Sequence, residues 1–314
     1  MQPFAINFQT APGTSNLMKA AGWGKVVFVE SGGGGSTTSG GRSPASALTL
    51  LDNAFDSGVT TANDGDIVFV MPGHAETVTA ANGIDIDIAG VTVQGLGSGT
   101  NKPTITMGTA TTATVRINAA NVTLRNLRFV GNIDSLVKFI DVNATYCTIE
   151  DCEFVTSSTK EATSFINLAD TIDYLTVRRC RFEQPTDPDG TDDAADTGCF
   201  FFADSEYILI ENCWFYGNFE TAIFHNRTTA AKNVWVRNCF GTQLLSTGLI
   251  YTQVAAMEGG NIGSTWNHRT AADVTEATWT GTVSANFVFD RTSGVLADGA
   301  AGGQYAAAGT SDNS

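Results

Sequence analysis

Residues 207–215, "YILIENCWF", decide the fold, because close variants of this string recur along the chain. The variants are "NVTLRNLRF" at 121–129, "YCTIEDCEF" at 146–154, "YLTVRRCRF" at 174–182 and "NVWVRNCF" at 233–240. The residues that open each apolar alternation lie 25 to 33 positions apart: Val122, Cys147, Leu175, Ile208 and Val234. A repeat of this length is typical of a solenoid, in which each unit packs only against its neighbours.

Each copy alternates apolar and polar residues at period two, which predicts a short strand. A residue that tolerates left-handed backbone geometry follows each strand, and this position predicts a bend. The bend residues are Asn126, Asp151, Asn212 and Asn238, with Arg179 as the departure.

Two apolar positions follow each bend. The first holds Cys152, Cys180, Cys213 and Cys239, where the earliest copy has Leu127. The second holds Phe129, Phe154, Phe182 and Phe215. A position shared by Leu and Cys is a buried one. The cysteines are therefore expected to be reduced core thiols, and the disulfides that an even count of six would allow are the weaker interpretation.

Units of two or three strands, stacked at about 4.8 Å, predict a parallel β-helix with columns of Asn, Cys and Phe. A leucine-rich repeat is the rival solenoid, but its helix and Leu spacing are missing. Outward residues such as Arg125, Glu150, Arg178, Glu211 and Arg237 should become neighbours of opposite charge between coils. Such a ladder explains these charges without a substrate.

The strings "SPASALTLLDNAFDSG" (43–58), "DGDIVFVMPG" (64–73) and "GVTVQGLGSG" (90–99) resemble the opening of the pectin-lyase-like superfamily. The resemblance implies a right-handed parallel β-helix that begins with a capping helix. Ser43-Pro44 and the apolar spacing from Ala45 to Phe55 also favour a helix there. The same fold serves polysaccharide lyases, glycosidases, phage tailspikes and virion shell proteins, so the resemblance implies no single function.

Three segments are expected. Residues 1–42 form an N-terminal arm with one strand in "GKVVFVES" and a glycine-rich link, residues 43–253 form the β-helix, and residues 254–314 form a small C-terminal module. The arm residues Phe4, Ile6, Phe8 and Trp23 are expected to contact a neighbouring subunit or partner, or to fold back along the solenoid. Trp266, Trp279 and Phe287 are expected to make a cap or an oligomer contact.

The net charge and the absence of long apolar stretches limit the partners and the location that we expect. A net charge of −15 opposes binding to nucleic acid or to an anionic membrane. No apolar stretch approaches the length of a membrane span, and the first residues lack the features of a signal peptide. We therefore expect a protein that is made and assembled in the cytoplasm.

Signals of chemistry are few. The motifs that glycosidases of the superfamily carry, "NTD", "GHG" and "RIK", are absent, so no catalytic residue is assigned. The three histidines, His74, His225 and His268, are expected to be structural, with His74 packing in the cap. No cofactor is expected. The acidic loop from Glu183 to Gly198 is expected to be a solvated bulge, with Ca²⁺ binding by Asp187, Asp189 and Asp192 as the alternative.

A short arm, a glycine-rich link and a lean solenoid together resemble virion structural proteins of tailed bacteriophages. The resemblance implies a capsid decoration or cement protein on the virion surface. It also implies binding to the major capsid protein and assembly as a homo-oligomer, a trimer by analogy. The alternative is an enzyme, either a tailspike depolymerase or a polysaccharide lyase that acts on a bacterial surface glycan. A carbohydrate-binding surface protein is a third, weaker option.

Overall fold

A computed structural model describes most of the chain between residues 25 and 305. The described ranges are 25–32, 41–56, 62–156, 160–184, 198–202, 204–226, 231–244, 249–253, 257–268, 279–281, 287–290, 296–300 and 304–305. The arm residues Phe4, Ile6, Phe8 and Trp23 and the loop residues Asp187, Asp189 and Asp192 lie outside these ranges.

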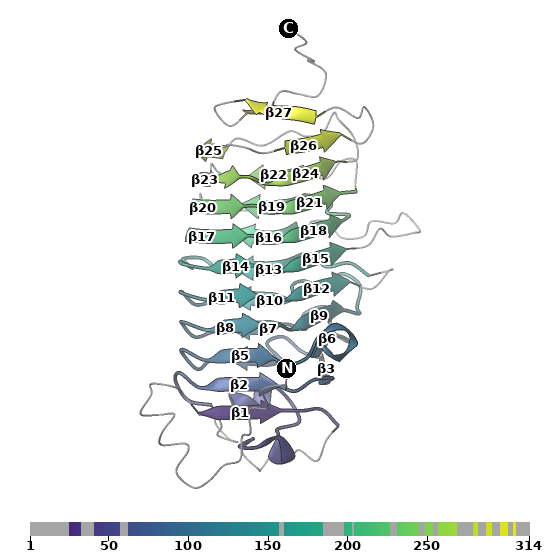
Figure 1. Cartoon of the computed structure of the whole chain (residues 1–314), viewed down its shortest axis with the longest axis vertical. Helices are drawn as coiled ribbons and strands as arrows, with labels where there is room; N and C mark the ends of the chain where they lie inside the picture. The colour runs from purple at the N-terminus through teal and green to yellow at the C-terminus, as the bar shows by residue number, and fades with distance from the viewer. Residues whose placement is uncertain are drawn as a thin grey trace, which may run out of the picture.

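Three long sheets run side by side along the axis of the molecule (Figure 1). We call them sheets A, B and C. Sheet A contains β1 (Val26–Val29), β2 (Ile67–Val70), β5 (Thr92–Gly95), β8 (Thr123–Arg125), β11 (Thr148–Glu150), β14 (Thr176–Arg178), β17 (Glu206–Glu211), β20 (Lys232–Arg237), β23 (Met257–Ile262) and β25 (Trp279–Gly281).

Sheet B contains β3 (Ala75–Val78), β6 (Thr104–Met107), β9 (Arg128–Gly131), β12 (Glu153–Thr156), β15 (Arg181–Gln184), β18 (Trp214–Gly217), β21 (Phe240–Gln243), β24 (Thr265–His268), β26 (Phe287–Asp290), β27 (Leu296–Ala300) and β28 (Gln304–Tyr305). Sheet C contains β4 (Ile84–Ile86), β7 (Val115–Ile117), β10 (Ile140–Val142), β13 (Ser164–Leu168), β16 (Gly198–Phe202), β19 (Ala222–Asn226) and β22 (Leu249–Gln253).

The chain visits the sheets in the order C, A, B in each coil, and strands of successive coils pair in parallel. The pairing places equivalent residues of the repeats opposite one another, for example Phe154 opposite Phe129 and Phe182. The prediction of a right-handed parallel β-helix is confirmed. Among the described residues, no helix is long and apolar enough to span a membrane.

Columns of identical side chains fill the interior. Phe129, Phe154, Phe182 and Phe215 are buried, and successive ring centroids lie 4.9, 4.9 and 5.0 Å apart. Offset stacking at this distance is favourable for aromatic rings and matches the spacing between parallel strands. The same residue type therefore recurs because each coil presents the same space to the next.

The bend between sheets A and B has the left-handed geometry that its residue types predict. The φ angles are 55° at Asn126, 56° at Asp151, 52° at Arg179, 54° at Asn212 and 50° at Asn238. Asn126 also donates from Nδ2 to the carbonyl oxygens of Gly95 and Gly97, at 2.9 and 3.0 Å. Arginine is a poor residue for this geometry, and its side-chain contacts, described below, explain why it is tolerated.

The prediction of a capping helix from Ala45 to Phe55 is wrong. The structure has two short 3-10 turns there instead, Pro44–Ser46 and Asp52–Ala54. Between them, the amide of Leu48 donates to the carbonyl of Phe28 at 2.8 Å, and the carbonyl of Leu48 accepts from Glu30 at 2.7 Å. Because both backbone groups pair with the segment around β1, Leu48 is extended and a continuous helix cannot form.

β1 is part of the solenoid, because it pairs in parallel with β2 at the start of sheet A. Sheet A therefore begins before residue 43, and sheets A and B continue past residue 253 through β23 to β26. The next strand, β27, pairs with β26 in antiparallel orientation. Figure 1 shows it lying across the end of the stack.

His74 packs in this N-terminal region, as its sequence position predicts. Its Nδ1 accepts a hydrogen bond from the Ser31 amide at 2.8 Å, so the ring proton must lie on Nε2. Nε2 then donates to Glu76 Oε2 at 3.0 Å, and Glu76 also accepts from the Leu51 amide at 2.8 Å. The network joins the first coil to the segment that covers its end.

Trp266 is a core residue and not an oligomer contact, because it is fully buried inside the chain. In the column of phenylalanines, the position after Phe215 is Gly241. A Cβ atom at Gly241 would lie 2.3 Å from the Trp266 ring, so the tryptophan occupies the space of the missing side chain. Trp279 and Phe287 begin β25 and β26, which extend sheets A and B.

Candidate functional site

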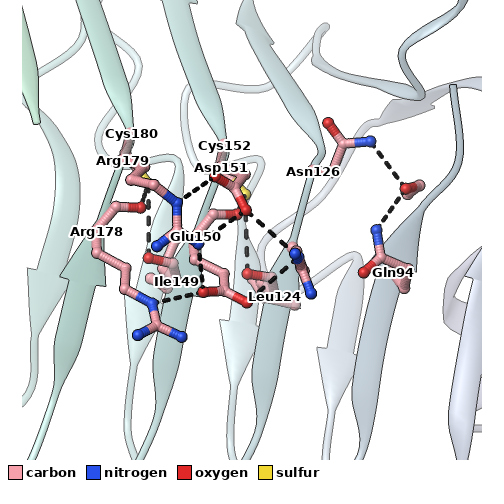
Figure 2. A network of polar contacts seen from close by, with 12 residues as sticks. Gln94, Leu124, Asn126, Ile149, Glu150, Asp151, Cys152, Arg178, Arg179 and Cys180 are labelled. Carbon is pink, nitrogen blue, oxygen red and sulfur yellow. Dashed lines mark hydrogen bonds and ion pairs between the residues drawn. The ribbon is translucent and has the colours of Figure 1, made fainter. Parts of the chain in front are cut away.

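A cluster of charged side chains covers the outer face of sheet A at its bend into sheet B (Figure 2). Glu150, whose side chain is only 7% exposed, lies at its centre. Its carboxylate contacts Arg178 Nε at 2.5 Å, Arg179 Nη2 at 2.9 Å and Arg125 Nε at 3.3 Å. These residues come from three successive coils, so the cluster joins β8, β11 and β14.

Asp151, next to Glu150, shares two of these cations. It accepts from Arg179 Nε at 2.7 Å and contacts Arg125 Nε at 3.3 Å. The hydrogen bond from Arg179 lowers the pKa of Asp151, and the same bond raises the pKa of Arg179. The outward charges expected on sheet A therefore become neighbours of opposite sign, and Glu150 and Asp151 pair with arginines of the adjacent coils. This arrangement stabilises the stack and does not point to a reaction.

The six cysteines are free and buried. The thiols of Cys152, Cys180, Cys213 and Cys239 each donate to the backbone carbonyl two residues earlier, at 3.3 to 3.4 Å. Burial raises the pKa of Cys147 to about 11 and that of Cys152, Cys180, Cys199 and Cys213 well above the ordinary value. A neutral thiol is a poor nucleophile and metal ligand, so these residues serve packing.

A second polar row lies on the outer face of sheet C, and it has a different character. Strand pairing aligns Asp85, Arg116, Asp141 and Asn167 on four successive coils. Arg116 donates to Asp85 through Nε at 3.0 Å and through Nη2. We call these four residues, together with Lys138, the sheet C row.

Asp141 is the most enclosed member of the row. Its side chain is 12% exposed, against 27% for Lys138 and 29% for Arg116. Lys138 Nζ lies 2.7 Å from Oδ2 of Asp141, and Asn167 Nδ2 donates to Oδ1 at 2.7 Å. Asn143 Nδ2 adds a longer contact of 3.3 Å. The carboxylate is thus fixed in orientation, with a lysine at its side and an arginine on the adjacent strand.

Asp141 differs from Glu150 of the sheet A cluster because it contacts one cation, Lys138, and not three arginines. A fixed carboxylate beside two cations can accept or deliver a proton while the cations bind an anionic group. The outward position of the row leaves Arg116 and Lys138 partly accessible to a polymer lying along the sheet. Sequence reasoning missed the row, because loops of different lengths separate its members.

The outer face of sheet B carries a group of aromatic side chains. Trp214 and Tyr216 lie on β18 with ring centroids 5.5 Å apart and ring planes within 3° of parallel. Phe240 follows Trp214 in the same column on β21. On β15, the guanidinium of Arg181 lies 4.6 Å from the centroid of Trp214 and also pairs with Glu183. We call these five residues the sheet B platform.

A third column of aromatic residues lies at the turn between sheets C and A. Tyr146, Tyr174 and Tyr207 are exposed, and successive ring centroids lie 4.5 and 4.7 Å apart. All three have positive φ, as do Asn121 and Asn233 at the matching turns of neighbouring coils. Because the ring faces cover each other, this column stabilises strained turns and leaves little flat surface for a ligand.

The remaining expected residues contribute no site among the described residues. His225 lies on β19 and is buried, and its coil is separated from the sheet C row by β16. In the described part of the chain, no group of three or more His, Cys, Asp or Glu side chains is arranged to hold a metal ion. The Ca²⁺ alternative at Asp187, Asp189 and Asp192 falls outside that part and stays a prediction.

Comparisons with known proteins bear on the fold. No family model matches the chain, and no curated protein matches it. A solved structure of "Rhamnogalacturonan lyase" is similar with a TM-score of 0.52 and 12% identity, over 78% of this chain and 74% of that one. GH136 lacto-N-biosidase from Eubacterium ramulus matches with a TM-score of 0.40 and 10% identity, over 88% of this chain and 69% of that one.

At 12% identity, the likeness to the lyase shows a common β-helix fold and nothing about activity. The second likeness is too weak to carry an argument. Neither of these two structures is described as a virion protein, and the expected resemblance to bacteriophage decoration proteins gains no support from them.

Proposed function

We propose that this chain cleaves a polysaccharide of a bacterial surface, with the sheet C row as its reacting centre. The observation that carries the proposal is the environment of Asp141, a fixed carboxylate with Lys138 at 2.7 Å and Arg116 on the paired strand. The fold is compatible with this function, and the sheet A cluster is the weaker candidate because its central carboxylate, Glu150, is only 7% exposed and is held by three arginines.

Elimination fits the row better than hydrolysis. Hydrolysis of a glycosidic bond uses two carboxyl groups, one of which must be protonated. Asp85 contacts Arg116 and Asp141 contacts Lys138, so each carboxyl group of the row already has a cation as its partner. Elimination needs a base that removes the C5 proton of a uronic acid and a cation that neutralises its carboxylate. The C4–O glycosidic bond breaks as the C4=C5 double bond forms, and solvent water protonates the departing oxygen. We therefore assign Asp141 as the base and assign Arg116 and Lys138 as the groups that bind the uronate.

The net charge of the chain affects how such a substrate would arrive. At −15, the molecule repels an acidic polymer at long range, while the row itself offers two cations at short range. Salt weakens the long-range repulsion more than the short contacts. The rate at low substrate concentration should therefore rise as salt increases from a low starting value.

The test uses polygalacturonate, alginate and acidic capsular polysaccharides as probes. Elimination produces an unsaturated uronate, which absorbs in the ultraviolet, whereas hydrolysis produces new reducing ends without that absorbance. We expect Asp141→Asn to lower kcat/KM by about 10²-fold or more, the usual contribution of a general base. Glu211→Gln, a change of an outward charge on sheet A, is the matched control and should leave the rate unchanged.

A full rate in Asp141→Asn would refute the assignment of the base. Absence of both product types with every acidic probe would refute the proposed reaction.

A non-enzymatic virion protein is the second candidate, and the internal pairing of the sheet A charges favours it, since such pairing stiffens a solenoid without serving a ligand. The residues proposed to bind the capsid, Phe4, Ile6, Phe8 and Trp23, lie outside the described part. Its test is the copy number of this chain in purified particles relative to the major capsid protein. A comparable copy number that falls on deletion of residues 1–42 supports this candidate, and absence from particles excludes it.

A further inference from the structure

We infer that the sheet B platform binds a neutral saccharide chain at a site separate from the sheet C row. The platform consists of Arg181 and Glu183 on β15, Trp214 and Tyr216 on β18, and Phe240 on β21. The inference takes a glycan as the ligand but does not depend on the cleavage reaction.

The aromatic side chains of the platform remain accessible although their neighbours in the interior are not. Tyr216 is 38% exposed and Phe240 is 39% exposed, whereas Phe215, between Trp214 and Tyr216, is fully buried. Exposed aromatic residues on a flat sheet need an explanation, because strand positions facing solvent are usually polar. In the same two outward columns, the next coils carry Thr242 and Thr265, which are the polar residues expected there.

The arrangement of rings and polar groups suits a sugar. A pyranose ring has an apolar face of C–H groups and a rim of hydroxyl groups, so it binds best where flat aromatic surface adjoins hydrogen-bonding side chains. Trp214 is stacked with Tyr216 and is also covered by Arg181, so the aromatic surface left for a ligand is that of Tyr216 and Phe240. Arg181 and Glu183 supply donors and acceptors beside it. Adjacent coils repeat at about 4.8 Å, close to the length of one sugar unit, so consecutive sugars can meet consecutive coils.

The charge of the platform selects a neutral ligand. Arg181 pairs with Glu183, and its guanidinium also lies over Trp214, so its charge is compensated. With that pair neutral and the whole chain at −15, an anionic polymer gains no net attraction here. The sheet C row has two cations and no exposed aromatic side chain among its five members, so the two sites differ in the ligand that they suit.

The size of the apolar surface argues against a protein partner. A stable protein interface buries about 800 Å² on each partner and contains a cluster of apolar side chains. Tyr216 and Phe240 are the exposed large apolar residues on this face in the described part of the chain. Two exposed rings beside the Arg181–Trp214 pair provide enough apolar surface to bind one or two sugar units. They provide too little for a stable interface between two protein chains.

The experiment is affinity gel electrophoresis of the whole chain in gels containing β-glucan, glucomannan or dextran as neutral probes, or alginate as the acidic probe. The test variant is Tyr216→Thr/Phe240→Thr, which gives β18 and β21 the residue type of the next coil and so preserves strand propensity. The control is Tyr146→Asn, which removes an exposed ring elsewhere and keeps a residue suited to positive φ. Thermal melting checks that both variants fold.

We expect at least one neutral glycan to retard the chain, and we expect Tyr216→Thr/Phe240→Thr to weaken binding about tenfold or more while Tyr146→Asn does not. The inference is overturned if no neutral probe binds, if the control loses binding equally, or if alginate alone binds. A lower molecular mass of the Tyr216→Thr/Phe240→Thr variant in solution would also overturn it, because the face would then be a contact between copies. Binding without cleavage would refute the proposed reaction and leave this inference standing.

Discussion

Replacing Glu150 by glutamine tests whether the charged cluster of sheet A stabilises the solenoid. The carboxylate is 7% exposed and contacts three arginines, which are themselves 39 to 48% exposed. Hydrogen bonds to charged groups contribute about 1.5–3 kcal/mol, but exposed ion pairs contribute only about 0.2–1 kcal/mol. In each contact the Glu150 carboxylate is buried and the arginine is partly exposed, so the expected contribution lies between these two ranges. We expect Glu150→Gln to lower the free energy of unfolding by about 2 kcal/mol.

The assay is denaturant unfolding followed by circular dichroism, with thermal melting as a second readout. A loss of about 2 kcal/mol corresponds to a fall in Tm of roughly 3 °C for a chain of this size. Glu211→Gln is the control, because Glu211 occupies the same column next to Arg178, yet no described cation lies within ion-pair distance of its carboxylate. The reasoning fails if Glu150→Gln costs less than about 0.5 kcal/mol, or if Glu211→Gln costs as much.

Four further predictions concern the interior, the bends and pH. Gly241→Ala places a Cβ 2.3 Å from the Trp266 ring and should cost about 1–3 kcal/mol in denaturant unfolding, whereas the same change at the exposed Gly65 meets no atom within 4 Å and should cost only backbone strain. Asn126→Ala should cost about 1 kcal/mol more than Asn126→Gly, because both lose the side-chain hydrogen bonds to Gly95 and Gly97 but only alanine is strained at a φ of 55°, and melting temperatures will separate the two. The pKa of Asp151 is lowered by Arg179, so its contribution to stability is present above its ordinary value of 3.8 and is lost as the pH falls below it. The thiol pKa of Cys147 is raised from 9.0 to about 11, so stability should fall as the pH rises between these values, and native protein at pH 8 should not react with a thiol reagent.

The repeated positions of this fold were predictable because stacking repeats the same environment. The apolar alternation from Ile208 to Ile210 recurs in each copy, since one side of every coil must face the interior. The bends at Asn126 and Asn238 were predictable for a similar reason, because few residue types tolerate a positive φ. The pairing of Arg178 with Glu150 followed from the same alignment.

Other features depend on contacts between segments that are distant in sequence. Apolar spacing from Ala45 to Phe55 suggested a helix, but pairing with β1 overrides it at Leu48. The sheet C row could not be read from the sequence, because loops of unequal length separate Asp85, Arg116 and Asp141 and hide their register. Tyr216 and Phe240 lie directly beside inward positions of the repeats, and a one-residue shift along a strand reverses the face on which a side chain lies, so the repeat pattern alone does not single them out.

The antiparallel strand β27 has a consequence for how copies of this protein meet end to end. A parallel stack that stopped at β26 would present a row of unpaired amides and carbonyls in the register that another coil needs, and it would template fibre-like growth. Pairing of Phe287–Phe289 with residues running in the opposite direction uses up that edge. β28 pairs with β27 only at Gly299 and Ala300, so the edge left at residues 296–298 runs in the wrong direction to continue the coil, and this reversal helps to keep the copies separate.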